Sequence, residues 1–174
     1  MILTLLTATF LTLFTTTVPG SELVEIQLID KLDETRSYCI DIKGYKERAK
    51  VHQGLQAHTC YSYQGQLGVD QAFDKGLTQF GKFYMPAFEV CMEAKSNKEG
   101  ASLILKDCNN TAVQKFNFSS EKQVKVSGKH DSCVAVESEK SKQGRGGTPP
   151  HLIRTLQVKS CSLTDLKYTA WKIK

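Results

Sequence analysis

Residues 60–74, CYSYQGQLGVDQAFD, begin with a cysteine and close on a glutamine that stands two places before a phenylalanine. In the first copy this glutamine is Gln71, in a second copy it is Gln114, and in a third copy Thr169 takes its place. Each copy has a cysteine, then a polar loop, then a closing aromatic residue: Phe73, Phe116 or Trp171. The chain therefore repeats one unit three times, at intervals of about forty residues.

Each copy also begins with a cysteine in a short apolar stretch, followed by a polar turn and a second stretch that ends in a cysteine. Runs such as SLILKDC and TLQVKSC alternate apolar and polar residues with a period of two, which predicts strands. The repeats cover approximately residues 30–80, 81–122 and 123–174. Each is too small to bury its own apolar face, so an all-β fold with three pseudo-symmetric repeats around a shared centre is expected.

The composition fits one exported domain. The chain has 174 residues, of which 40% are hydrophobic, enough for a single core. Residues 1–20, MILTLLTATFLTLFTTTVPG, are apolar, uncharged and end in small residues, which predicts a signal peptide; an uncleaved membrane anchor is the alternative. Residues 21–174 then form one secreted, extracellular domain without a further span. In an oxidising compartment the six cysteines should pair within the repeats: Cys39 with Cys60, Cys91 with Cys108, and Cys133 with Cys161.

The Cys-x-Asp of SYCID, the Gln-x-x-x-Cys of QAHTC and the Gln-x-aromatic closures resemble the ricin B-type lectin family. The resemblance covers roughly residues 30–174 and implies a β-trefoil. By resemblance, Asp41 is the carboxylate that anchors a sugar, Gln56 and Asp70 add polar contacts, and His58 occupies the ring-stacking position. Gln71 belongs to the same site, although in the family the closing glutamine and aromatic mainly build the core.

The first repeat also departs from the family pattern. Its loop is longer, histidine replaces a larger aromatic residue, and Asp70 stands where the family usually has asparagine. Tyr61 and Tyr63 lie on that loop and are expected to supply the stacking surface. The alternative interpretation is that Asp41 caps a turn while His58 and the tyrosines cover the rim of the barrel.

The second and third repeats have lost the expected sugar ligands. In the second repeat, Glu93, Ile104 and Lys106 replace the aspartate, the glutamine and the stacking residue. In the third repeat, Ala135 replaces the aspartate and Lys159 replaces the stacking residue. One shallow site, in the first repeat, is therefore expected, for glycans or glycoproteins that carry galactose or N-acetylgalactosamine.

Charge and glycosylation signals give further expectations. Asn109 and Asn117 are glycosylation acceptors in a secreted protein. The net charge of +5 includes the runs KGYKERAK, KSNKE and EKSKQGRGG, so basic loops that bind sulfated or sialylated glycans are an alternative function. The insertion KQGRGGTPPHLIR predicts an exposed loop. Nucleic acid is not an expected partner, because the usual aromatic and basic motifs are lacking.

Catalysis is not expected. The four histidines, His52, His58, His130 and His151, are scattered, and neither a His-x-x-x-His nor a Gly-x-Ser-x-Gly motif occurs. No metal or cofactor is implied. A trefoil that binds a protein partner, as trefoil inhibitors and cytokines do, is the third functional class. The sequence is best interpreted as a secreted lectin.

Overall fold

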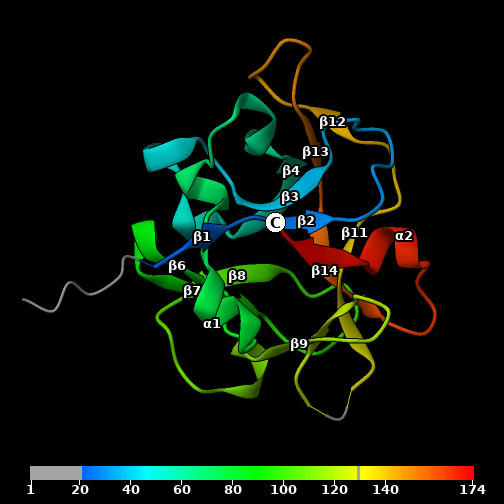
Figure 1. The fold of residues 1–174 in the computed structure, drawn as a ribbon. Helices are drawn as coiled ribbons and strands as arrows, with labels where there is room; N and C mark the ends of the chain where they lie inside the picture. Colours follow the sequence, from blue (N-terminus) through cyan, green and yellow to red (C-terminus); the bar gives the residue numbers. More distant parts are fainter. Residues whose placement is uncertain (1–20, 129) are drawn as a thin grey trace, which may run out of the picture.

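The computed structural model describes residues 21–128 and 130–174, so the predicted signal peptide lies outside the described residues. The chain is built mostly from short antiparallel strands (Figure 1). The α-helices α1 (Lys75–Gln79) and α2 (Leu166–Thr169) each follow an aspartate whose carboxylate caps the first turn. Within the described residues, no helix is long and apolar enough to cross a membrane.

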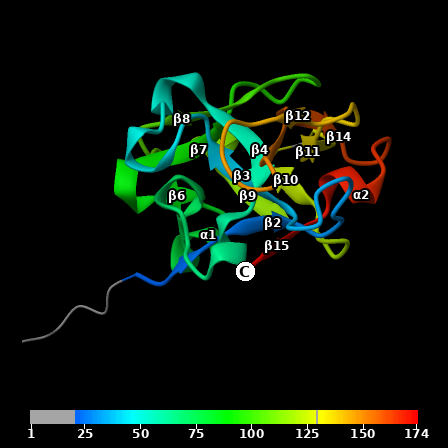
Figure 2. The ribbon, with the colours of Figure 1, turned by 90° about the horizontal axis from the view of Figure 1, so that it is seen from above.

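One sheet joins both ends of the chain to the first segment, residues 30–80. Its spatial order is β12 (Lys142–Gln143), β13 (Leu152–Arg154), β4 (Leu55–Thr59), β3 (Tyr38–Ile42), β2 (Ile26–Leu28) and β15 (Trp171–Ile173). The C-terminus consequently lies beside β2 (Figure 2).

The other strands form smaller sheets. Their orders are β14 (Leu156–Ser160), β11 (Ser132–Val136), β10 (Val124–Val126), β9 (Phe116–Phe118); then β6 (Tyr84–Met85), β7 (Val90–Ala94), β8 (Leu103–Lys106); and β1 (Leu23–Val24) with β5 (Phe73–Asp74). Short 3-10 helices connect the strands: η1 (Lys46–Arg48), η2 (Val51–Gln53), η3 (Tyr61–Gln64), η4 (Val69–Gln71), η5 (Pro86–Phe88) and η6 (Ala112–Gln114).

Disulfides close three of the strand pairs in the described part of the chain, and they are the three that the sequence predicts. In each pair the first cysteine lies within a strand and the second lies one or two residues beyond the end of its partner strand: Cys39–Cys60 on β3 and β4, Cys91–Cys108 on β7 and β8, and Cys133–Cys161 on β11 and β14. Such a set of disulfides is typical of an oxidising, extracellular compartment.

The closing aromatic residues of the three segments build the core. Phe73, Phe116 and Trp171 are fully buried. The Phe83 ring lies between the first two, with ring centroids 6.0 Å from Phe73 and 5.1 Å from Phe116. The Trp171 indole donates a hydrogen bond to the carbonyl of Val134 at 2.9 Å, so its buried polar atom is satisfied. The repeated pattern thus marks core positions.

The insertion of the third segment folds back onto the first segment. After β12 the chain loops outward and returns as β13, which pairs with β4 in a register that places Ile153 opposite His58 (Figure 1, orange). Arg36 donates to the carbonyls of Pro149 and Pro150, at 2.9 Å each. The tip of this loop is exposed, as expected from the sequence, but its last residue, His151, is buried against the first segment.

Candidate functional site

Gln71 joins three parts of the first segment. Its amide nitrogen donates to Asp41 Oδ2 and to the carbonyl of Thr59, at 3.0 Å each. Its amide oxygen accepts from the backbone N–H of Tyr61 at 2.9 Å. One buried side chain on η4 therefore links strand β3, the end of β4 and the loop that follows Cys60. We call this arrangement the amide bridge.

Asp41 lies beneath the surface at the centre of this network. It stands opposite Gln56 in the β3–β4 register, and the Gln56 amide donates to Asp41 Oδ1 at 2.8 Å. Asp41 is 1% exposed. Burial, and secondly the nearby Asp70 carboxylate, raise the pKa of Asp41 well above its ordinary value. In this conformation Asp41 offers no atom to a solvent-borne sugar, so the direct contact expected from the sequence is not available.

His58 and Asp70 are also enclosed. His58 Nδ1 lies 2.9 Å from the carbonyl of Thr59, an acceptor, so this nitrogen carries the proton of the neutral ring. Burial lowers the pKa of His58 to about 4. Asp70 is fully buried; its Oδ2 accepts from the backbone N–H of Lys46 at 2.7 Å, and burial raises its pKa. This hydrogen bond fastens the 43–50 loop to η4, which also carries Gln71.

Four aromatic side chains form a cluster next to the amide bridge: His58, Tyr61, Tyr63 and His151. The His58 ring lies 5.2 Å from Tyr61 and 5.1 Å from His151, and Tyr61 lies 5.5 Å from His151, measured between centroids. Tyr63 Oη is 2.8 Å from His151 Nε2. Tyr61 is buried, whereas the Tyr63 ring is exposed and Arg36 stacks on it at 5.2 Å. The structure thus brings together His58 and both predicted tyrosines.

His151 is the member of this cluster that was not predicted from the sequence. It lies 88 residues from Tyr63 along the chain and arrives through the insertion of the third segment. No local spacing could have identified it, because the contact depends on how β13 pairs with β4.

A surface hollow of about 250 Å³ lies beside the cluster, and we call it the outer hollow. Its wall combines aromatic rings, amides, opposite charges and glycine backbone: Tyr45, Lys46, Glu47, Tyr61, Gln64, Gln66, Leu67, Gly68, Val69, Gly146, Gly147 and His151. The Tyr45 side chain is half exposed. At Gly147, where φ is +83°, an added Cβ would lie 2.4 Å from the His151 ring, so the wall requires glycine there. The outer hollow can present ring faces together with hydrogen-bonding groups to a ligand.

The second segment, residues 81–122, repeats the amide bridge. The Gln114 amide donates to Glu93 Oε2 at 2.8 Å and to the carbonyl of Asp107 at 3.0 Å, and its oxygen accepts from the N–H of Asn109 at 2.8 Å. Glu93 is only partly buried and borders an open hollow of about 650 Å³ together with Lys106. The carboxylate is thus held as in the first segment, but it remains accessible to solvent.

The third segment, residues 123–174, closes in a different way. The Gln123 amide donates to Thr169 Oγ1 at 3.2 Å and to the carbonyl of Cys161 at 3.0 Å. Ala135 stands opposite Gln157, where the first segment has Asp41 opposite Gln56. This segment therefore has no carboxylate at the position of Asp41.

Both predicted glycosylation acceptors are exposed. Asn109 borders the second-segment hollow, and its side-chain oxygen accepts from the N–H of Thr111 at 2.9 Å. Asn117 lies on β9 and its amide donates to Ser127 Oγ at 2.9 Å. Glycosylation at either residue stays a prediction.

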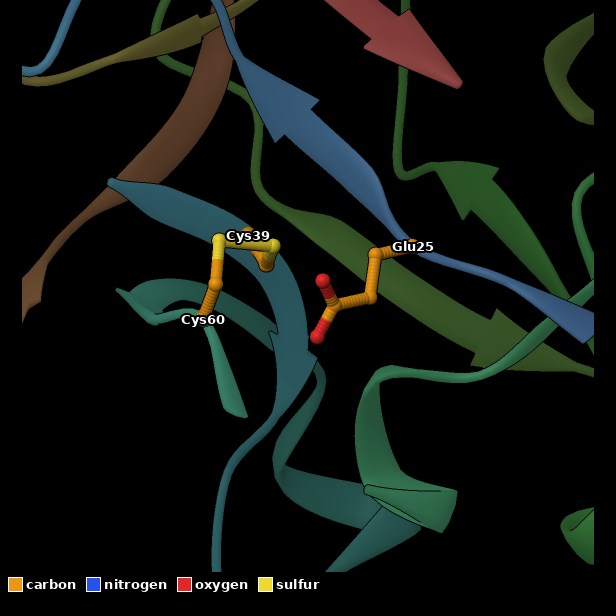
Figure 3. Close-up of side chains that lie close together, drawn as sticks. All are labelled: Glu25, Cys39 and Cys60. Atoms are coloured by element: carbon orange, nitrogen blue, oxygen red, sulfur yellow. A yellow bond between two sulfur atoms is a disulfide. The ribbon is translucent and has the colours of Figure 1, made fainter. Parts of the chain in front are cut away.

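Glu25 lies beside the first disulfide (Figure 3). Its carboxylate and the sulfurs of Cys39 and Cys60 lie within 4.8 Å of one another. Because the two sulfurs are bonded to each other, neither offers a thiolate to a metal ion. Glu25 Oε1 accepts from the N–H of Ser62 at 3.1 Å, so this buried acid supports the start of η3.

The fold has known structural counterparts. No protein-family model and no curated protein sequence matches the chain. Among solved structures, the β-trefoil lectin of the Vibrio vulnificus hemolysin/cytolysin, with N-acetyl-D-lactosamine bound, aligns with a TM-score of 0.56 and 15% identity, over 89% of this chain and 95% of that one. An agglutinin from Abrus precatorius aligns with a TM-score of 0.51 and 15% identity, over 88% of this chain; the chain spans about half the agglutinin's length, 46%. The chain has the β-trefoil fold of the ricin B-type lectins.

Proposed function

We propose that this chain is a secreted carbohydrate-binding protein that holds a glycan at one shallow site on the first segment and carries out no catalysis. The three segments then act as pseudo-symmetric repeats, of which the first carries the site. The observation that carries the proposal is the outer hollow, where aromatic rings and hydrogen-bonding groups converge beside the amide bridge.

The outer hollow has the chemistry that a sugar requires. The half-exposed Tyr45 ring offers apolar surface on which the C–H face of a sugar ring can stack, and the buried Tyr61 and His151 rings line the same hollow. The Glu47 carboxylate accepts hydrogen bonds from hydroxyls, and the Gln64 amide both donates and accepts. These groups are distributed around one concavity, as in small-ligand sites generally.

The residues expected from the sequence have a supporting role in this proposal. Asp41, Gln56 and Gln71 fix the floor of the first segment through the amide bridge. Asp70 holds Lys46, which places Tyr45 and Glu47 at the rim. His58 and Tyr63 hold the His151 ring in the wall. Direct contact between Asp41 and a sugar would require the 43–50 loop to move.

A glycan array with purified mature protein tests this proposal. N-acetyl-D-lactosamine and glycans ending in galactose or N-acetylgalactosamine are the first probes, since the Vibrio lectin structure contains N-acetyl-D-lactosamine. A shallow site should bind roughly in the millimolar to high micromolar range, so multivalent display is needed. Tyr45→Ala should weaken binding about tenfold through lost stacking. Phe80→Ala is the matched control, because Phe80 is 89% exposed and does not line the outer hollow.

The outcomes separate the functional classes. Binding that Tyr45→Ala weakens and Phe80→Ala does not would support the site. Equal glycan binding by both variants would show that the outer hollow is not the glycan site. A chain that binds no glycan and instead captures a defined protein partner would favour the trefoil class that binds proteins. Asp41→Asn should weaken glycan binding less than Tyr45→Ala, because Asp41 is enclosed.

A further inference from the structure

A second cavity, of about 390 Å³, opens where the three disulfide-closed strand pairs end; we call it the strand-end hollow. Leu55, Leu103 and Leu156 occupy the first position of β4, β8 and β14, are buried, and line it from the three segments. The hollow lies apart from the outer hollow and shares none of its lining residues.

The rim has equivalent positions in the three strand pairs. The backbone N–H groups of Lys43, Lys95 and Glu137 each donate a hydrogen bond to the backbone carbonyl of the residue directly before a leucine. These residues precede Leu55, Leu103 and Leu156, and the distances are 3.2, 3.0 and 2.9 Å, in that order. Two of the three equivalent positions therefore carry lysine. Lys140 and Lys142 add two further cations from the third segment.

The four rim lysines keep their charges available. Among residues 21–128 and 130–174, none of them has a carboxylate oxygen within 4.0 Å. Arg154 also lines the hollow, but its guanidinium is engaged by Asp33 at 2.8 Å and by the carbonyl of Glu137 at 2.8 Å. Asp33 thus neutralises the one arginine of the lining, while the lysines stay unpaired.

The acids of the lining do not cancel this charge. Glu137 and Glu139 are the carboxylates among the described lining residues, against four lysines. The Glu137 carboxylate accepts a hydrogen bond from the neutral Gln157 amide at 2.7 Å, which does not change this balance of charges. Four lysines that line one concave hollow attract an anion more strongly than the same charges spread over open loops.

The remaining lining groups suit a sugar attached to that anion. The side chains of Gln53, Ser102 and Thr155 offer donors and acceptors for hydroxyl groups. The partly exposed side chains of Ile104 and Ile153 offer apolar surface. A volume of this size lies within the range of small-ligand pockets. A long polyanion such as nucleic acid would need an extended groove.

We propose that the strand-end hollow binds an acidic saccharide, with its sulfate or carboxylate between the rim lysines and its ring against Ile104 and Ile153. This site is additional to the outer hollow and does not depend on it.

Isothermal titration calorimetry at low ionic strength, with three pairs of ligands, tests the proposal. A sulfated disaccharide is compared with its desulfated form, a sialylated trisaccharide with its asialo form, and inorganic sulfate with chloride. We expect one acidic saccharide to bind, its uncharged form to fail, and added salt to weaken the binding. The pair that responds identifies sulfate or carboxylate as the anion.

Charge-matched variants localise the binding. K43Q with K95Q should weaken it about tenfold, since two close charge contacts are lost. K125Q with K172Q removes the same charge from exposed residues outside the hollow and should change affinity less than about twofold. His151→Ala should leave this binding intact, which separates it from failure of the outer hollow. Equal losses in both double variants, sulfate ion binding as tightly as the saccharide, or no binding of either acidic saccharide would each overturn the proposal.

Discussion

The first and second segments hold a carboxylate with the same amide bridge but expose it differently. Gln71 and Gln114 each join an acid, the carbonyl before a half-cystine and the N–H after it. Asp41 is buried, while Glu93 is partly exposed and borders an open hollow.

This difference shows that the amide bridge is a structural element of both segments. The third segment has no carboxylate at this position and closes with a different glutamine, Gln123, which donates to Thr169 and to the carbonyl of Cys161. What a segment exposes is decided by the loops that are added to it. In the first segment these are its own 43–50 loop and the insertion that ends at His151.

The largest effect should come from removing the bridge where it is buried. Gln71→Ala leaves Asp41, the Thr59 carbonyl and the Tyr61 N–H short of partners away from water, so we expect a loss of about 4 kcal/mol. Gln114→Ala should cost about 1.5 kcal/mol, because water can reach Glu93. Urea denaturation followed by fluorescence measures both. Equal losses would show that the two carboxylates are equally sealed, and the comparison would fail.

His58, buried in the first segment, should make the free energy of unfolding depend on pH. Its pKa is about 4 in the folded chain against 6.5 as the ordinary value, so its contribution is complete above pH 6.5 and is lost as the pH falls toward 4. The loss across this window should be about 3 kcal/mol. Asp41 acts in the opposite direction, since its raised pKa favours the folded chain at low pH. The difference in unfolding free energy between the wild type and His58→Asn isolates the histidine.

In that experiment the difference between the two proteins should grow as the pH rises from 4 to 6.5 and then level off. A constant difference would mean that His58 takes up a proton as easily in the folded chain as in the unfolded one. The buried ring cluster would then be accessible to water.

A smaller loss of stability should come from adding a side chain at Gly68, in the tightly packed first segment. A Cβ at Gly68 would lie 2.4 Å from Tyr61 Cδ2 and 2.9 Å from Asp70 Oδ1, so Gly68→Ala should destabilise by about 2 kcal/mol. Gly76→Ala is the control within α1, where the nearest atom is 3.4 Å away, and it should stabilise by up to about 1 kcal/mol. Thermal unfolding measures both. If Gly68→Ala had no effect, the Tyr61 ring would not be fixed by its neighbours.

The fold could be predicted because its signals are local and repeated. Cysteines in alternating strands predicted the disulfides, because each disulfide joins two strands of one segment. The closing aromatic residues predicted core positions, because the same apolar position recurs in each segment. The aspartate at 41 and the glutamine at 71 do meet, as the family pattern implies.

The accessibility of the candidate site could not be predicted in the same way. Around the buried Asp41, Asp70 binds Lys46 across 24 residues, and His151 reaches the His58 ring from another segment. Such packing depends on the lengths and paths of loops, on which periodicity carries no information. The sequence therefore indicates which residues lie near one another, while the structure shows which of them reach solvent.

The smallest effect should come from Glu93→Gln. A glutamine keeps an oxygen that accepts from the Gln114 amide, and its partly exposed end can be solvated, so stability should change by less than about 0.5 kcal/mol. Urea denaturation at pH 7 measures the change. A loss above about 1 kcal/mol would mean that the Glu93 charge itself is required, as expected of a carboxylate paired in a closed site. A near-zero value here, together with a smaller loss for Gln114→Ala than for Gln71→Ala, would assign the difference between the two segments to the accessibility of their carboxylates.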